Sequence, residues 1–164
     1  MAVDLSEYVS SLRREVTPLG SDPFSTVTDT QWTDYLADSF WEARLDGFLQ
    51  GWTADEDGVV SPVPPNTLEL PREQIAAIII YAGVRVLRNK ILNTNTTFRA
   101  KAGPVEYETQ NSATMLAEML KQLKAVKDRL LDGLTESDAT SVAYIDAYSA
   151  RLGIAQPTLA LGSG

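Results

Sequence analysis

The residues that could do chemistry in this chain are almost all carboxylates, because the sequence contains no histidine and no cysteine. Asp34, Asp38 and Glu42 recur at every fourth position, which would place them in a row along one helix face. Carboxylates can act as acid and base in hydrolysis, so a carboxylate-based hydrolase is one hypothesis. A row of acids at this spacing is more typical of the solvent-exposed face of a helix, and we favour that interpretation.

A second acidic group, Asp55, Glu56 and Asp57, precedes Gly58. It superficially resembles a cation site but lacks the spacing of acids, glycine and distal glutamate that defines an EF-hand loop, so an exposed turn is the better interpretation. Without histidine or cysteine, Ser-His and Cys-His nucleophile pairs and nearly all zinc and haem ligation are excluded. We therefore expect no enzymatic activity, no metal and no cofactor.

The composition is that of an ordinary soluble globular protein, with 164 residues, 44 % hydrophobic and 22 % charged. Its net charge of −8 disfavours direct binding to nucleic acid or to an anionic membrane. The longest apolar run, Ile75–Val84, has about half the length needed to span a bilayer, and the acidic N-terminus lacks the features of a secretory signal. We expect a soluble protein made in the cytoplasm, with no membrane partner.

Hydrophobic periodicity and capping signals predict a mainly α fold, a small bundle of four to five helices. The expected helices cover residues 4–16, 28 to about 49, 71 to about 92, 112–134 and 135–152. Thr28–Gln31 and Thr135–Asp138 match the capping-box pattern, and Gly153 followed by Ile154 is a candidate C-terminal cap. The helix that starts at Pro71 is apolar all round in its first half, as a central helix requires.

Three segments are expected to lie outside these helices. Residues 54–70 predict an exposed loop or small hairpin, with a turn at Asp57–Gly58 and short β-like pieces such as Val59–Val60. Residues 95–110 predict a protruding hairpin-like arm, with 98–102 lying against 105–109. Residues 154–164 carry no charged side chain and predict an extended C-terminal tail that follows a helical domain over 1–153.

Six of the thirteen aromatic residues lie between Gln31 and Trp52, and on a helix this segment would present two apolar stripes. One stripe contains Trp32, Leu36, Phe40 and Ala43, and the other contains Trp41, Leu45, Phe48 and Trp52. One stripe is enough to face the core of a small protein. Either both stripes are buried in one compact bundle, or the second contacts another subunit. We predict that the first stripe is core and that the second is interface.

Three segments resemble head-to-tail connector proteins of long-tailed bacteriophages, also called adaptor or head-completion proteins. They are YLADSFWEARLDGF in the aromatic helix, DEDGVVSPVPPN before the long apolar helix, and FRAKAGPVEYETQNSATML, which leads into the next helix. The likeness covers residues 4–152 in order and character. It consists of patterns of composition and element order, with no catalytic signature.

The resemblance implies a virion structural protein at the head-tail interface, made in the host bacterium, that forms a ring of about twelve copies. The ring would bind the capsid portal on one side and a stopper or tail-terminator protein on the other, and DNA would pass through its lumen without specific binding. The arm would make ring contacts through Phe98, Arg99, Lys101, Val105 and Tyr107. The tail would dock on the portal through Ile154, Pro157, Leu159 and Leu161.

The main alternative is a small acidic helical binding or regulatory module that acts as a monomer or dimer. Its acidic surface would mimic or capture a basic partner. In the ring hypothesis, by contrast, acids such as Asp55, Glu56 and Asp57 could line the lumen and repel DNA, which keeps the DNA mobile.

Overall fold

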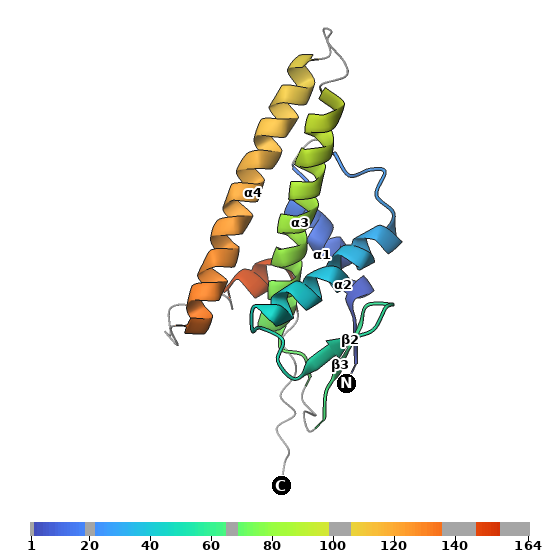
Figure 1. Ribbon diagram of the computed structural model, residues 1–164, viewed down its shortest axis with the longest axis vertical. Coiled ribbons are helices and arrows are strands. Elements are labelled where there is room, and N and C mark those ends of the chain that lie inside the picture. The colour runs from blue at the N-terminus through green and yellow to red at the C-terminus, as the bar shows by residue number, and fades with distance from the viewer. Residues whose placement is uncertain (1, 19–21, 65–68, 99–105, 136–146, 155–164) are drawn as a thin grey trace.

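The computed structural model describes residues 2–18, 22–64, 69–98, 106–135 and 147–154. These residues form a mainly helical fold with a small sheet near one end (Figure 1). The elements are β1 (Val3–Asp4), the 3-10 helix η1 (Leu5–Tyr8), α1 (Val9–Val16), α2 (Asp29–Leu45), β2 (Trp52–Ala54), β3 (Val59–Pro62), α3 (Arg72–Phe98) and α4 (Glu106–Thr135). Residues 147–151 are also helical. The predicted mainly α class is confirmed.

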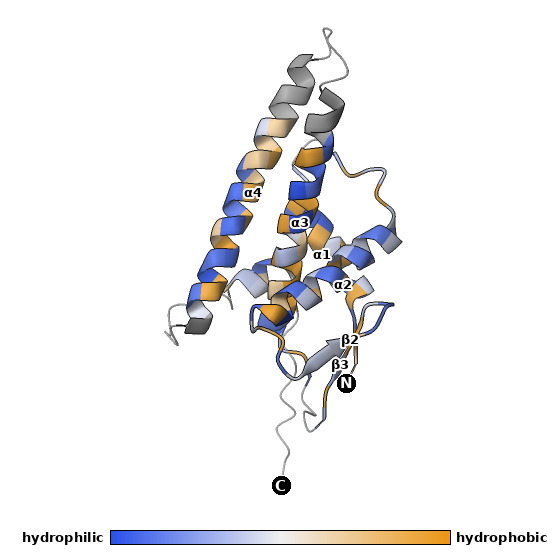
Figure 2. Cartoon of the chain, in the orientation of Figure 1, coloured by the Kyte–Doolittle hydropathy of each residue, from blue (hydrophilic) through white to orange (hydrophobic). Residues whose placement is uncertain are grey.

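The first half of α3 is the centre of the fold. Every residue from Ile75 to Gly83 is buried, and α1, α2 and α4 all pack against this helix. Gly83 allows a close approach, because a Cβ there would lie 3.0 Å from Leu123 on α4 and 3.3 Å from Val16 on α1. Figure 2 shows hydrophobic and hydrophilic residues alternating along α4, as expected for a helix with only one face on the core.

The start of α2 follows the predicted capping box. The Thr28 hydroxyl accepts a hydrogen bond from the Gln31 backbone N–H at 3.3 Å, and the Gln31 side chain accepts one from the Thr28 N–H at 2.9 Å. The helix ends at Leu45, about four residues before the predicted end. Gly47 adopts a φ of 100°, and the Phe48 N–H donates to the Ala43 carbonyl at 3.0 Å, an arrangement that terminates helices.

The sheet is antiparallel, with strand order β1-β3-β2. Its β2–β3 hairpin confirms the small hairpin predicted after the aromatic helix. The strand β1 is unexpected, because residues 4–16 were predicted to form one helix. Val3 instead pairs with Val60, the Leu5 N–H donates to the Gly58 carbonyl at 3.1 Å, and regular α-helix begins only at Val9.

Helices α3 and α4 form a long antiparallel hairpin whose far end extends beyond the other elements (Figure 1). The predicted arm of two extended segments over 95–110 is therefore wrong where the structure describes it. Helix α3 continues through Phe98, and α4 begins at Glu106, before the predicted start at residue 112. Residues 99–105 lie outside the described part. Turn-favouring Asn and Thr residues at 93–97 suggested a break, but propensity is a weak guide to helix ends.

The C-terminal helical residues 147–151 return to α1. Gly153 has a φ of 74°, and the Ile154 N–H donates to the Ser149 carbonyl at 3.2 Å, which confirms the predicted cap. The Ser11 hydroxyl donates to the Leu152 carbonyl at 3.2 Å and ties this turn to α1. The rest of the predicted last helix and the second capping box fall in residues 136–146, outside the described part.

Candidate interaction surface

In the carboxylate row on α2, Asp34 and Asp38 are exposed, as predicted, whereas Glu42 is half-buried, and the row also joins three helices. The Arg85 guanidinium on α3 lies 3.0 Å from Asp38 and 3.9 Å from Glu42. The Lys127 ammonium on α4 lies 2.7 Å from Glu42. Asp34 is exposed and makes no ion pair within the described part of the chain. Two of the three acids therefore hold α2 against α3 and α4.

A buried tyrosine continues this network at the C-terminal end of α2. The Tyr81 hydroxyl donates to Asp46 at 2.6 Å, and the Lys127 ammonium lies 3.8 Å from the centre of the Tyr81 ring. Burial raises the pKa of the Tyr81 hydroxyl far above its ordinary 10.0, and the hydrogen bond to Asp46 raises it further. The neutral Tyr81 hydroxyl is therefore a fixed hydrogen-bond donor. We call Tyr81, Asp46 and Lys127 the Tyr81 corner, and it secures the C-terminal end of α2. The network was missed from the sequence, although the complementary charges of α2 and α3 were a usable signal.

The outer face of α2 carries a mixed acidic and apolar surface, here termed the α2 stripe: Asp34, Asp38, Trp41 and Leu45. Trp41 is 41 % exposed and Leu45 is 88 % exposed. The Trp41 ring meets the edge of Phe40 with centroids 5.2 Å apart, and the Arg44 guanidinium lies 5.3 Å from its centre. A tryptophan held in place on the surface loses little conformational freedom when it binds a partner. The stripe is suited to a protein–protein contact.

Two residues of the predicted interface stripe are in the core instead. Phe48 and Trp52 lie beyond the end of α2, so they do not continue its helical spacing. Phe48 packs on the Tyr81 ring with centroids 5.9 Å apart, and Trp52 is buried at the start of β2. Both residues are thus unavailable to a neighbouring subunit. The predicted core stripe of Trp32, Leu36, Phe40 and Ala43 is fully buried, which confirms that half of the prediction.

The predicted arm contacts fall at the far end of the α3–α4 hairpin. Phe98 is the last residue of α3, and Tyr107 lies in the first turn of α4. Arg99, Lys101 and Val105 lie outside the described residues. These five residues therefore stay a prediction of ring contacts, carried by a helical hairpin where the arm was expected to be extended.

The predicted portal-docking tail begins one residue too early. Ile154 is buried in the main hydrophobic core and caps the turn after residue 151, so it belongs to the folded body. Pro157, Leu159 and Leu161 lie outside the described residues, and their role stays a prediction.

The acidic group Asp55, Glu56 and Asp57 forms the exposed turn of the β2–β3 hairpin, as predicted. The Asp55 carboxylate accepts hydrogen bonds from the N–H groups of Asp57 at 3.1 Å and Val59 at 2.8 Å. An aspartate that bonds the backbone two residues on stabilises a tight turn. The local role of Asp55 is therefore structural.

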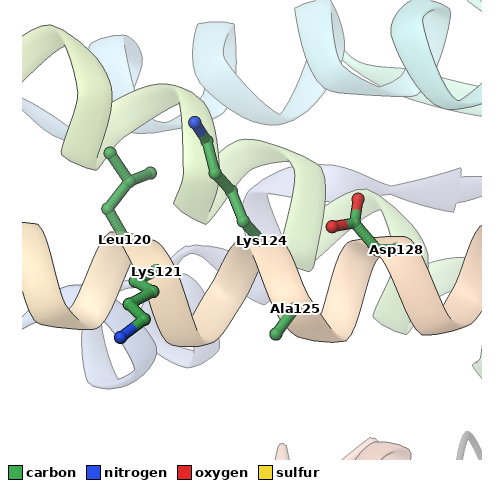
Figure 3. Close-up of a pocket in the computed structure, with 5 residues that line it drawn as sticks. All are labelled: Leu120, Lys121, Lys124, Ala125 and Asp128. Carbon is green, nitrogen blue, oxygen red and sulfur yellow. The ribbon is translucent and has the colours of Figure 1, made fainter.

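A shallow hollow of about 450 Å³ lies on α4, lined by Leu120, Lys121, Lys124, Ala125 and Asp128. Figure 3 shows Leu120, Lys124 and Asp128 projecting to one side of the helix and Lys121 and Ala125 to the other. The charged groups do not converge on a common point, so the hollow lacks the arrangement of a catalytic site. It is an open amphipathic surface, here termed the α4 hollow.

Within the described ranges, no three acidic side chains gather closely enough to hold a metal ion. In the same ranges, none of the helices combines the length and apolar character needed to cross a bilayer. The features that stand out are therefore surfaces: the α2 stripe and the α4 hollow.

Compared with protein-family models, curated proteins and solved structures, the chain has no significant match in any of the three.

Proposed function

We propose that this chain is a structural subunit of a bacteriophage virion, one copy of a ring that joins the capsid portal to the next protein of the tail. The observation that carries the proposal is the exposed Trp41–Leu45 pair on a helix whose opposite face already fills the core. Assembly is the function that uses such a surface directly. The mainly helical fold is also the one expected for such a subunit.

The exposed pair has the character of an interface centre. Tryptophan is among the residues that most often supply the binding energy of protein contacts when a partner covers them. In the monomer Leu45 is 88 % exposed, so its side chain buries almost no apolar surface and contributes little to folding. In a ring, each copy contacts two neighbours through different surfaces, so apolar surface beyond the core is required.

The charge of the chain suits a ring that surrounds DNA without binding it. The net charge is −8, and Asp55, Glu56 and Asp57 are all exposed on one tight turn. If this turn faces the lumen, the acids repel the phosphate backbone and leave the DNA free to move.

The direct test is to combine the purified chain with the assembled portal of the same virus and to examine the mixture by electron microscopy. We expect a ring of this chain on one face of the portal. Replacing both Trp41 and Leu45 by Ala should leave a folded protein that adds to the portal poorly. Leu92→Ala, which trims a 54 % exposed leucine on α3, is the matched control and should form rings normally.

A chain lacking residues 155–164 tests the tail separately, and this boundary leaves the buried Ile154 in place. We expect it to fold but to bind the portal more weakly. A full-length chain that never binds the portal, and stays monomeric while it captures a basic protein, would instead support the acidic binding module.

A further inference from the structure

The α4 hollow lies between two rows of side chains. Leu120, Lys124 and Asp128 form one row at a spacing of four residues, and Lys121 and Ala125 form the other (Figure 3). Rows at this spacing are the ridges of a helix surface, and the groove between two of them receives a ridge from another helix. The hollow therefore has the form of one half of a helix–helix contact.

The α2 stripe supplies a ridge of the matching kind. Trp41 and Leu45 are four residues apart and exposed, and Asp34 and Asp38 form a parallel row beside them. Placed in the groove, the apolar pair would cover the aliphatic stems of the lysines, and the Trp41 ring could lie against a lysine ammonium.

The charges occur in complementary order along the two helices. From the N-terminal to the C-terminal end, α2 has Asp34 and Asp38 followed by Arg44, and α4 has Lys121 and Lys124 followed by Asp128. Along the axis, Asp34 and Arg44 are about 15 Å apart and Lys121 and Asp128 about 10 Å, and the long arginine and lysine side chains span the difference. If the helices run in roughly the same direction, acids meet lysines and Arg44 meets Asp128. The opposite direction would bring like charges together.

The same complementarity extends over the chain and identifies the occupant as a second copy. Residues 1–70 carry thirteen acidic and three basic side chains, whereas residues 85–129 carry nine basic and four acidic ones. Lys121 and Lys124 form no ion pair within the part of the chain that the structure describes. The acidic region of one copy is therefore attracted to the basic helical hairpin of another.

The two surfaces lie on different parts of the molecule. In Figure 1, α4 stands at one edge, and α2 crosses α3 with its N-terminal end far from α4 and its C-terminal end on the α4 side, where Glu42 pairs with Lys127. A contact between two different surfaces is heterologous, and repetition of it produces a closed ring or an open filament.

We propose that the α2 stripe of one copy packs into the α4 hollow of a second copy, with the two helices running in the same general direction and crossing at about 50°. The inference rests on the proposed ring function and names the surfaces that meet in it. It makes Trp41 the apolar anchor, Asp34 the partner of Lys121 and Arg44 the partner of Asp128. Asp38, which already pairs with Arg85 of its own chain at 3.0 Å, would share its carboxylate with Lys124.

The sharpest test uses the absence of native cysteine in the chain. Leu45→Cys and Ala125→Cys are prepared separately, mixed, and treated with a short bismaleimide cross-linker, both in solution at high concentration and on portal particles. We expect a cross-linked dimer from the mixture and little from either variant alone. Gln122→Cys, an exposed position on α4 outside the hollow, replaces Ala125→Cys as the matched control and should cross-link poorly.

A charge exchange tests the register. Asp34→Lys alone, or Lys121→Glu alone, should weaken self-association at low salt by roughly two- to fivefold for each exposed ion pair. Mixing the two variants should restore association, because each altered surface then meets either its altered or its native complement. Trp41→Ala should weaken association more, by about 30-fold. Sedimentation equilibrium measures all of these constants.

The outcomes separate this inference from the proposed function. Rings on the portal without the expected cross-link, or with no response to the charge exchange, would overturn the inference and leave the ring function standing. Cross-linked pairs in solution from a chain that never binds a portal would support the contact between α2 and α4 and would contradict the ring function. A chain that neither associates with itself at low salt nor cross-links on particles overturns the inference.

Discussion

The two faces of α2 carry the same kinds of residue and have opposite environments. On the inner face, Trp32, Leu36 and Phe40 are each at most 1 % exposed. On the outer face, Trp41 and Leu45 point away from the body beside Asp34 and Asp38. Apolar content alone therefore does not identify a core. What separates the faces is the charge between the apolar residues of each: the outer pair follows Asp34 and Asp38 at helical spacing, whereas the inner stripe has an acid in line with it only at Asp29, the first residue of the helix.

The largest expected effect comes from breaking the inner face. Trp32→Ala removes a side chain that contacts Phe24 and is covered by Arg13, with centroid distances of 5.6 and 5.5 Å. We expect the free energy of unfolding to fall by about 3–5 kcal/mol, because a large cavity forms in the core. Urea denaturation measures it. Trp41→Ala is the matched control on the outer face; an equal loss there would mean that the two faces do not differ.

A substitution in the Tyr81 corner should lower the free energy of unfolding by less than Trp32→Ala does, and the loss should depend on pH. Tyr81→Phe removes the hydrogen bond to Asp46 and should cost about 1–2 kcal/mol near neutral pH. The folded-state pKa of Tyr81 is raised above its ordinary 10.0, so its contribution is present below pH 10 and is lost as the pH rises further.

Urea midpoints between about pH 8 and pH 11 check this sign, because unfolded tyrosine titrates near pH 10. The wild type should lose more stability over this interval than Tyr81→Phe. If both proteins lose the same amount, Tyr81 does not carry the alkaline sensitivity. Tyr35→Phe, a partly exposed tyrosine on α2, is a suitable control.

A substitution at Ser39, on the inner side of α2, should raise the free energy of unfolding. Ser39 is fully buried, and its hydroxyl has no hydrogen-bond partner among the described residues. Ser39→Ala removes an unsatisfied polar group and improves helix propensity, so we expect a gain in stability of up to about 1 kcal/mol. Thermal and urea denaturation together measure it. A clear loss would show that the hydroxyl is bonded, for example to an ordered water.

Local signals in the sequence were sufficient for the parts of the fold that local chemistry determines. The Thr28 capping box, the apolar first half of α3 and the Gly153 cap were all predicted correctly, because each depends on a few neighbouring residues. The predicted end of α2 near Leu49 is wrong because the helix terminates before Gly47, whose positive φ occurs two residues after Leu45. The consequence was large: Phe48 and Trp52 were extrapolated along a helix that had already ended.

The misplaced parts of the site depend on contacts between distant segments. Because β1 pairs with β3, the first α-helix begins later than its local sequence predicts. The ion pairs of Arg85 and Lys127 with acids of α2 depend on how three helices pack, which local sequence patterns do not show. The α4 hollow is formed by side chains of one helix, but its proposed role as a binding groove depends on the complementary α2 stripe. Periodicity places residues on a face; only tertiary structure shows which face is covered.

The smallest expected effect on stability concerns Leu45 on the outer face of α2. Leu45 is 88 % exposed, so Leu45→Gln should change the free energy of unfolding by no more than about 0.5 kcal/mol. The same substitution removes apolar surface from the α2 stripe, so it should lower ring formation while the unfolding curve stays unchanged. Urea denaturation and electron microscopy of portal mixtures on one preparation provide both measurements. A side chain that matters for assembly and not for folding belongs to an interface, whereas a loss of stability would place Leu45 with the inner stripe.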